Sequence, residues 1–399
     1  MGGGEVNLHL LAKALVKKNN EVSILTSHHS GLKKNEIIDG IKIYRTLKTG
    51  SEPSGLCNNF KRSHLFPKSA EREIKKIAKN QDFDLIHFIG ASVIAAAKLK
   101  ELNIPLFATV ESYPALCPKG DRIYHGRKEC QQRCTYRKFI SCQLNSSEIG
   151  KTKNSWYLKY NLPLLSYIFN YFKKVQLGLK YCNLISISEY VKKILEQHGL
   201  SSTVIPNALE IDFFKPKNQV NTQKGGKIKV LYLGALIRSK GPHILLQAIK
   251  GIDCHCNLYG AGIMKEELLS YIKDNNLDAT IHHPVPYHQV PNLYHQSDIV
   301  VFPSLWPEPF GRIAIEAMAA GTPVIASTIG GIKETVEQGA GLLVKAGDIK
   351  ELKEKISLLI SSPELRKKIS KEGQNKVKSF NETSIIDKLI KIYSEKIEK

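Results

Sequence analysis

The sequence predicts an α/β protein with two Rossmann-like, doubly wound domains that face each other across a cleft. Apolar segments of strand length alternate with helical patterns along most of the 399 residues. This alternation is typical of parallel sheets that are covered by helices on both faces. It stops at a polar segment, residues 215–227, and then starts again. The chain therefore divides into two halves of about 200 residues, each long enough to bury its own core.

The first half opens on a helical pattern, because leucines recur at helical spacing from Leu8 to Leu15. The strands predicted after it cover residues 21–26, 41–45, 84–89, 104–110 and 183–187, and helices cover 68–79 and the region from about 189. A doubly wound domain normally has a strand before its first glycine-rich loop, but only Met1 precedes Gly2. We therefore expect the first strand to be missing, either because translation starts upstream or because the sheet lacks its central strand.

The second half repeats the pattern with stronger apolar runs. Its predicted strands cover residues 228–233, 253–259, 298–302 and 323–326, and its helices cover 241–250, 264–274, 312–320 and most of 349–399. We assign residues 1–206 to the first domain, with a basic, cysteine-containing insert at about 113–180. Residues 207–380 form the second domain, and 381–399 form a C-terminal helix that packs back toward the first.

Composition and charge narrow the class of protein. The 58 Lys and Arg residues exceed the 37 Asp and Glu residues, which gives a net charge of +21. This excess favours nucleic acid, phosphorylated small molecules or an anionic membrane face, without choosing among them. No apolar run reaches the roughly 18 residues of a membrane span. Lysines interrupt the N-terminal apolar stretch, and eight cysteines are too few for a secreted disulfide scaffold, so we expect a cytoplasmic protein.

The segment at residues 303–317 carries the most specific chemistry. Pro307 and Pro309 keep Glu308 out of a helix. Gly311 lets the backbone turn, so that a helix can start at about Arg312. The start of a helix presents free N–H groups, which bind phosphate. The segment therefore predicts an acidic loop beside an anion-binding helix start.

A second glutamate, Glu316, follows one turn inside this helix. It lies roughly 6 Å along the helix axis from Arg312, which is about the offset between the phosphates and the ribose of a nucleotide. One carboxylate can then face a sugar from the loop while the other binds ribose hydroxyls. Taken alone, two glutamates are more typical of a capping residue and a solvent-facing helix residue than of a nucleotide site.

The residues around this pair resemble the retaining GT-B glycosyltransferases of family 4. The pattern is Pro-Ser, Glu-Pro-Phe-Gly and Glu-Ala-Met-Ala-Ala-Gly-Thr-Pro-Val-Ile-Ala-Ser, with seven residues between the two glutamates. The resemblance spans nearly all of residues 2–396 and is densest from 204 to 348. Further matching segments lie at 204–207 with Phe214, at 240–248, at 258–262, at 294–298 and at 330–334.

The resemblance implies that the first domain faces the acceptor and the second binds a nucleotide-diphosphate sugar. It places Glu308 beside the donor sugar, Glu316 on the ribose and Lys240 on the diphosphate. The other positions that it assigns to the donor are Gly3, Gly4, Arg238, Gly260, Phe310, Gly311, Arg312 and Ile313. The family retains the anomeric configuration and uses neither a cofactor nor a divalent metal, so basic residues and helix dipoles must carry the charge of the leaving group.

Two positions depart from the family pattern. Ala235 stands where the family has an arginine that holds the diphosphate, and Arg238 could replace it if the loop folds inward. Thr109-Val110-Glu111 stands where the family often has Thr-x-His-Asp near the reacting centre. Glu111 could hydrogen-bond the sugar or the acceptor, or it could have no role in the chemistry. A carboxylate beside a diphosphate is unfavourable unless it is protonated or turned toward hydroxyls.

The insert has two features of its own. Its four cysteines, Cys117, Cys130, Cys134 and Cys142, could hold a structural metal ion, form a cross-link or be free thiols, and a subset of the family has a similar cysteine pattern. Between residues 130 and 188 there are nine Lys or Arg, one acid and many aromatics. This composition suits an anionic membrane surface that presents a lipid-linked acceptor. It also suits an aromatic core with a lysine exterior.

The sequence therefore predicts a retaining, metal-independent glycosyltransferase with a lipid-linked or polysaccharide-precursor acceptor, cytoplasmic or peripheral on the inner face of the membrane. The main alternative is a non-catalytic relative that binds a nucleotide sugar or a partner, which Ala235 and Glu111 motivate. A nucleic-acid-binding protein is a weaker alternative, because only the net charge supports it and no nucleic-acid motif is present. An epimerase of the same fold would convert the sugar nucleotide without an acceptor.

Overall fold

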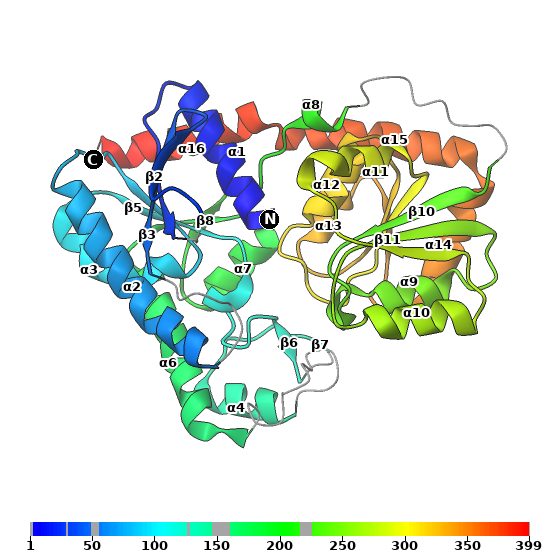
Figure 1. Ribbon diagram of the computed structural model, residues 1–399, viewed down its shortest axis with the longest axis horizontal. Helices are drawn as coiled ribbons and strands as arrows, with labels where there is room; N and C mark the ends of the chain where they lie inside the picture. Colours follow the sequence, from blue (N-terminus) through cyan, green and yellow to red (C-terminus); the bar gives the residue numbers. More distant parts are fainter. Residues whose placement is uncertain are drawn as a thin grey trace.

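The computed structural model describes residues 3–28, 31–48, 56–125, 128–145, 160–215 and 226–398, and leaves the side chains of residues 56–62 undescribed. Two α/β domains lie side by side (Figure 1). The N-terminal domain contains strands β1 to β9, and the C-terminal domain contains β10 to β15. The predicted fold class is therefore confirmed.

The C-terminal domain is built on one parallel sheet in the order β12-β11-β10-β13-β14-β15. Every residue of β13 and β14 is buried, because helices cover both faces of the sheet. The strands are β10 (Ile228–Leu233), β11 (Cys254–Tyr259), β12 (Ala279–His282), β13 (Ile299–Phe302), β14 (Val324–Ser327) and β15 (Leu342–Val344).

Helices cover the two faces of this sheet and complete two hydrophobic clusters. One face packs against α9, α10 and α14, and the other against α11, α12 and α13. The helices of this domain are η5 (Arg238–Lys240), α9 (Pro242–Ala248), α10 (Lys265–Asp274), η6 (Tyr287–Gln289), α11 (Val290–His295), α12 (Arg312–Ala319), α13 (Ile332–Val336), α14 (Ile349–Ser361), α15 (Pro363–Val377) and η7 (Lys378–Phe380).

The N-terminal domain has its sheet in two parts. The first part has the order β1-β3-β2 and the second, fully parallel part has the order β4-β5-β8-β9. Their strands are β1 (Ser23–Ser27), β2 (Asn35–Ile38), β3 (Ile41–Leu47), β4 (Ile86–Ile89), β5 (Leu106–Val110), β8 (Asn183–Ser186) and β9 (Ser202–Val204). Both β1 and β4 line a largely apolar cavity of about 320 Å³. This break is where a doubly wound sheet has its first strand, and in the described residues no strand pairs with both β1 and β4.

The helices around this sheet include one that is longer than predicted. Helix α2 (Leu56–Ala78) contains Pro67, a residue that normally begins or breaks a helix, and this explains why the pattern was assigned only from residue 68. The other elements are α1 (Gly3–Lys17), η1 (Gly90–Ala95), α3 (Ala96–Leu99), η2 (Lys100–Leu102), η3 (Tyr113–Ala115), β6 (Ile123–Tyr124), β7 (Lys128–Glu129), α4 (Tyr136–Leu144), α6 (Leu162–Leu179), α7 (Glu189–Gln197) and α8 (Ile211–Phe214).

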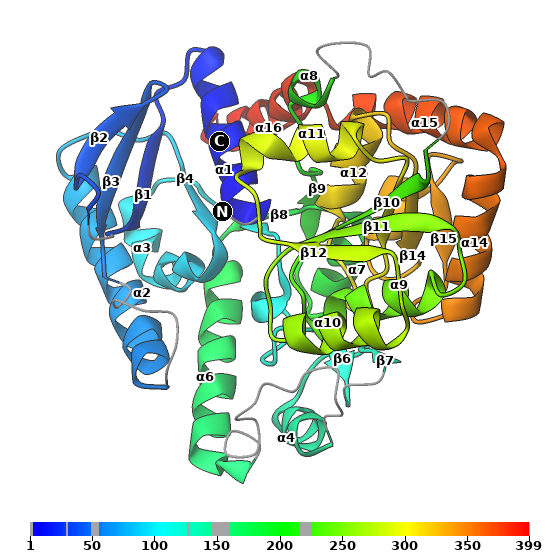
Figure 2. The ribbon, with the colours of Figure 1, turned by 45° about the vertical axis from the view of Figure 1, so that its right-hand side comes forward.

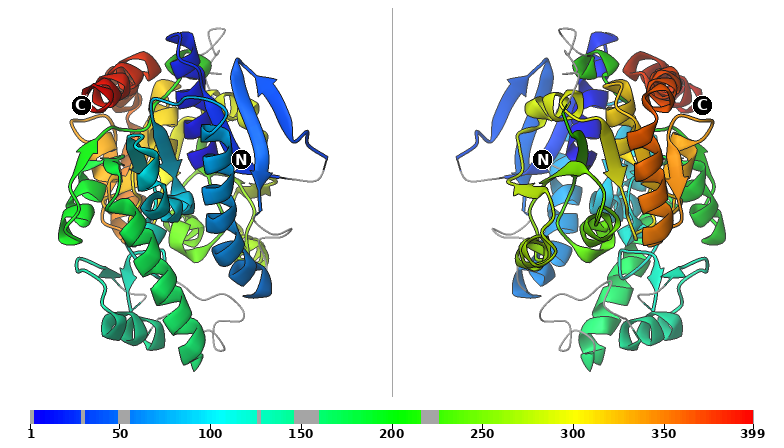
Figure 3. Two further views of the ribbon diagram at one scale, coloured as in Figure 1. Left: turned by 90° about the vertical axis from the view of Figure 1, so that its left-hand side faces the viewer. Right: turned by 90° about the vertical axis from the view of Figure 1, so that its right-hand side faces the viewer.

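Two features shape the whole molecule. Helices α4 and α6, with the β6–β7 hairpin, extend away from the two sheets (Figure 2). Helix α16 (Glu382–Ile397) crosses from the C-terminal domain and lies on α1 (Figure 3), where Glu382 pairs with Lys17 at 2.8 Å. Tyr393 packs on Phe107 in a small hydrophobic cluster at this contact. Within the described ranges, no helix has the length and apolar character that a bilayer crossing requires.

Candidate functional site

The candidate site lies where loops from neighbouring strands of the C-terminal domain approach the N-terminal domain. Strand β10 leads into η5, which carries Lys240, and the adjacent strand β13 leads into the loop that carries Glu308. The carboxyl ends of parallel strands meet at one edge of a sheet, which is where ligands bind in doubly wound domains. The fold thus brings together two residues that are far apart in sequence.

Lys240 and Glu308 form an ion pair. The Nζ of Lys240 lies 2.6 Å from Oε1 of Glu308, and the same oxygen accepts a hydrogen bond from Ser304 at 2.9 Å. The side chain of Glu308 is 7% exposed and that of Lys240 is 23% exposed. Lys240 also lies over the ring of Trp306, 4.3 Å from its centroid. The buried carboxylate therefore has a partner that a ligand can reach from solvent.

Two glycines shape these loops. A Cβ atom on Gly241 would lie 1.9 Å from the carbonyl oxygen of Pro303, and its φ of 72° lies in the left-handed region. Gly311 has φ 96° and immediately precedes α12, which begins at Arg312 as predicted. Glu308 itself pairs as an isolated bridge with Gly330 and stays outside any helix, as its flanking prolines require. The start of α12 therefore lies next to the acidic loop.

Glu316 is buried one turn into α12 and is surrounded by hydrogen-bond donors. Its Oε1 accepts from the hydroxyl of Tyr287 and from Nε of Arg312, both at 2.8 Å. Its Oε2 accepts from the hydroxyl of Tyr294 at 3.1 Å. Burial raises the pKa of Glu316, and these three donors oppose that shift. The carboxylate is thus fixed in one orientation.

Glu111 reaches the same region from the N-terminal domain, at the end of β5. Its Oε1 accepts a hydrogen bond from Nδ2 of Asn7 at 2.7 Å. Burial raises the pKa of Glu111 to about 7, while Asn7 and Arg312 act in the opposite direction. A Cβ atom on Gly4 would lie 3.0 Å from Oε2 of Glu111, so a larger residue there would crowd this carboxylate.

A hydrogen-bonded chain connects the two domains at this point. The Oδ1 of Asn7 accepts the backbone N–H of Ala208 at 3.3 Å. Nη1 of Arg312 donates to the carbonyl of the same Ala208, also at 3.3 Å. Glu111 and Glu316 are therefore linked through Asn7, the backbone at Ala208 and Arg312.

The other residues predicted to bind the sugar nucleotide differ from Lys240, Glu308 and Glu316 in what surrounds them. The ring of Phe310 is buried and packs edge-on against Phe380 at 5.4 Å, so its backbone rather than its side chain borders the helix start. Gly260 is needed for packing, because a Cβ atom there would lie 1.9 Å from the carbonyl of Gly234. Ile313 packs against the core, and Gly3 begins α1. Arg238 lies half-buried on η5, two residues before Lys240.

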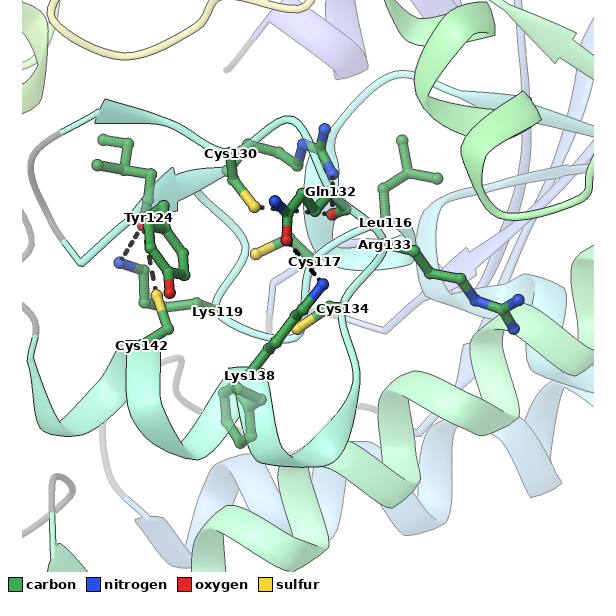
Figure 4. A pocket seen from close by; sticks show the side chains of 13 residues that line it. Leu116, Cys117, Lys119, Tyr124, Cys130, Gln132, Arg133, Cys134, Lys138 and Cys142 are labelled. Atoms are coloured by element: carbon green, nitrogen blue, oxygen red, sulfur yellow. Dashed lines mark hydrogen bonds between the residues drawn. The ribbon is translucent and has the colours of Figure 1, made fainter.

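The four cysteines of the insert line one small cavity of about 30 Å³ (Figure 4). All four are free thiols, and burial raises the pKa of Cys134 to about 12. In the part of the chain that the structure describes, no group of three or more His, Cys, Asp or Glu side chains is arranged to hold a metal ion. A structural metal ion at these four thiols stays a prediction.

Several residues that complete the site are not recognisable from the sequence. Tyr287 and Tyr294 bind Glu316, Asn7 binds Glu111, and Ser304 binds Glu308. A lone tyrosine or asparagine outside a motif carries no signal in one sequence. Tyr294 was noted only as part of the pattern at residues 294–298.

Comparisons with known proteins show the family and the fold. The profile of Glycosyltransferase Family 4 matches residues 1–213, and that of Glycosyl transferases group 1 matches residues 214–376. The uncharacterized glycosyltransferase MJ1178 of Methanocaldococcus jannaschii is 30% identical over 214 residues, which are 53% of this chain and 59% of that protein. The chain spans about half the length of the curated relatives it matches.

Two solved structures share the fold across the whole chain. Sucrose-phosphate synthase from Thermosynechococcus elongatus has a TM-score of 0.77 at 21% identity and covers 99% of this chain and 93% of its own. Anabaena Alr3699/HepE in complex with UDP-glucose has a TM-score of 0.69 at 19% identity, over 99% of this chain and 96% of its own. The two domains are therefore those of a GT-B fold. Since the family profile covers more than half of the sequence, the chain belongs to glycosyltransferase family 4.

Proposed function

We propose that this protein transfers a sugar from a nucleotide-diphosphate sugar to a hydroxyl acceptor, with retention of the anomeric configuration and without a divalent metal. The contact between Lys240 and Glu308, beside the start of α12, carries the proposal. It combines a cation for the diphosphate, a carboxylate for the sugar and free helix N–H groups in one place. The UDP-glucose complex of Anabaena HepE supports a donor of this class.

In this reaction, the bond between the anomeric carbon and the diphosphate oxygen breaks, and its electron pair stays on the diphosphate. The acceptor oxygen bonds to the anomeric carbon from the same face and gives its proton to the leaving phosphate. Lys240, Arg238 and the N-terminus of α12 oppose the growing negative charge. Glu308 accepts hydrogen bonds from the sugar, and Glu316 accepts them from the ribose.

The first test distinguishes the proposed roles of the two carboxylates, Glu316 and Glu308. We expect Glu316→Ala to weaken UDP or GDP binding by at least about tenfold, because ribose loses a buried acceptor. We expect Glu308→Ala to lower turnover more than nucleotide affinity, because it acts on the transferred sugar. Calorimetry with both nucleotides and a transfer assay measure these effects, and the exposed Glu354→Ala is the control. Unchanged transfer in both site variants would refute the assignment, and nucleotide binding without transfer by the unaltered protein would favour the non-catalytic alternative.

We further propose that the acceptor is lipid-linked and is presented at an anionic membrane surface. Helices α4 and α6 extend from the body of the molecule and contain no Asp or Glu. They expose Tyr136, Leu144 and Leu162 beside lysines and arginines. Exposed apolar and basic residues together suit the headgroup region of anionic lipids.

Vesicle flotation tests this surface. We expect the protein to float with vesicles that contain phosphatidylglycerol and to remain unbound with neutral phosphatidylcholine, with binding that weakens as salt increases. Leu162→Glu together with Tyr136→Glu should reduce flotation, while Leu358→Glu, an exposed position on α14, should not. Equal binding to both kinds of vesicle, or none, would contradict the membrane proposal and would leave the transfer assay unaffected.

A further inference from the structure

The backbone around Glu308 is held from the N-terminal domain on both sides. The hydroxyl of Tyr113 donates to the carbonyl of Pro307 at 2.5 Å, and that of Ser188 donates to the carbonyl of Pro309 at 2.6 Å. The carbonyl of Glu308 accepts the N–H of Gly331 at 2.6 Å. Three consecutive carbonyls are thus fixed, and two of the three donors belong to the other domain.

Both donors are themselves fixed. Tyr113 is fully buried in η3, and its ring packs edge-on against Trp306 at 5.5 Å. Ser188 is 2% exposed, and its Oγ also accepts the N–H of Val191 as the N-cap of α7. A buried hydroxyl with a defined partner has few alternative orientations, so these contacts specify the position of the loop.

A third contact joins the N-terminal domain to the C-terminal domain near the Glu308 loop. The carboxylate of Glu334, on α13, accepts the N–H groups of Glu189 and Tyr190 at 2.8 and 2.7 Å. These N–H groups belong to the first turn of α7, which has no helical partners for them. A Cβ atom on Gly331 would lie 2.3 Å from the carbonyl of Pro309 and 2.9 Å from Oγ of Ser188, so the two domains meet here with no room for a side chain.

We propose that Tyr113 and Ser188 are positioning residues, through which the N-terminal domain sets the carboxylate of Glu308 toward the donor sugar. This inference rests on the proposed function. The nucleotide is held by C-terminal-domain residues, whereas the acceptor is expected on the N-terminal domain. Contact between the two domains then orients Glu308 toward the donor sugar only when the nucleotide side and the acceptor side of the site lie against each other.

The test compares two hydroxyl deletions with matched controls. Tyr113→Phe and Ser188→Ala should lower kcat by about tenfold to a hundredfold, because a displacement of about 1 Å has effects of that size. The KM for the donor and the Kd for UDP should stay within about twofold. Tyr393→Phe and Ser186→Ala remove buried hydroxyls that bond His87 and Ser202, away from the loop, and should keep kcat within about twofold. Ser188→Ala removes both the loop contact and the N-cap of α7. Tyr113 caps no helix, so Tyr113→Phe tests the loop contact without the loss of a cap.

A double-mutant cycle distinguishes positioning from general destabilisation. If Tyr113 acts through Glu308, Tyr113→Phe will cause no further loss of kcat in a Glu308→Gln background. Additive losses, or wild-type kcat in both hydroxyl variants, would overturn the inference while leaving the proposed transfer activity intact. A protein without transfer activity would instead count against the proposed function.

A measurement on Trp306 tests the same inference without activity. In a Trp156→Phe background, acrylamide quenching reports the exposure of Trp306, which lies in the loop beside Tyr113. We expect Tyr113→Phe to increase quenching and Tyr393→Phe to leave it unchanged. Equal quenching in both would show that the loop keeps its position without Tyr113 and would overturn the inference.

Discussion

The two glutamates of the site show how neighbours give the same side chain different properties. The cation beside Glu308 is Lys240, a flexible and partly exposed side chain that can turn toward an incoming diphosphate. The cation beside Glu316 is Arg312, which is also held by Tyr287 and by the carbonyl of Ala208. We infer that the side of the site proposed to bind ribose is preformed, whereas the side proposed to bind the sugar can rearrange when a donor binds.

Glu111 gives a prediction on pH at the level of one residue. Its pKa is raised from 4.5 to about 7 in the folded protein. Between these values the folded state holds a proton that the unfolded state has released, so the free energy of unfolding falls as pH rises, by at most about 1.4 kcal/mol per pH unit. We expect Glu111→Gln to remove this slope. Chemical denaturation at pH 5, 6, 7 and 8 measures it.

The exposed Glu101→Gln is a control for this experiment and should keep the slope of the wild-type protein. Parallel stability profiles for Glu111→Gln and the wild-type protein would show that burial does not hold a proton on Glu111. In that case its carboxylate would be charged at neutral pH and would face hydroxyls rather than the diphosphate.

At the level of elements, the site depends on how two loops leave adjacent parallel strands. The loop after β10 reaches Pro303, in the loop after β13, because Gly241 is left-handed and has no Cβ. Gly311 is also left-handed and leaves room for Ile332 of α13. Prolines on both sides keep Glu308 extended, so that α12 starts only after Gly311. The direction of α12 is therefore set by the turn that precedes it.

Gly311→Ala tests this turn. A Cβ atom at this position would lie 2.7 Å from Cγ1 of Ile332, and φ is 96°. We expect a loss of about 2–4 kcal/mol in the free energy of unfolding, from backbone strain and displacement of Ile332. The displaced start of α12 should also weaken UDP binding. Denaturation and calorimetry measure the two effects.

Gly339→Ala is the matched control, because its φ of 81° is similar but nothing lies within 4 Å of the added Cβ. It should lose only about 1 kcal/mol and bind UDP normally. Equal losses in the two variants would show that the contact with Ile332 does not shape the turn.

At the level of the whole molecule, the divided sheet of the N-terminal domain is the least expected feature. In the described residues, β1 pairs only with β3 and β4 pairs only with β5, and both strands line the same apolar cavity. Helix α1 contributes Leu8 to the same cavity. The two parts of the sheet are thus held by helices and by the contact with α16 rather than by a shared strand.

A short strand-forming segment added at the N-terminus tests whether the divided sheet can accept another strand. Five alternating valines and isoleucines placed ahead of the chain should pair with the edges of β1 and β4 and fill the cavity. We expect Tm to rise by at least about 5 °C, measured by calorimetry. A glycine-serine segment of equal length is the control and should leave Tm unchanged. The same Tm for both extensions would show that the two edges do not accept a strand.

The sequence by itself determined the longer apolar elements and the loop chemistry, whereas the strands β12 and β15 were not predicted. Strands such as β13 and β14 are uniformly apolar because both sides are buried, and Pro307, Pro309 and Gly311 act on their own neighbours. The position of Glu308 outside a helix and the start of α12 at Arg312 therefore followed from local rules. The family pattern at 303–328 added the expectation of a nucleotide-sugar site.

Only the tertiary structure decided which groups surround these residues. Asn7 meets Glu111 and Tyr113 meets Pro307 across separations of 104 and 194 residues, and no local pattern encodes such contacts. The same holds for the split sheet, for the Phe310 ring that packs on Phe380, and for the four thiols. Local backbone preferences act over a few residues, whereas side-chain partners depend on how whole domains pack.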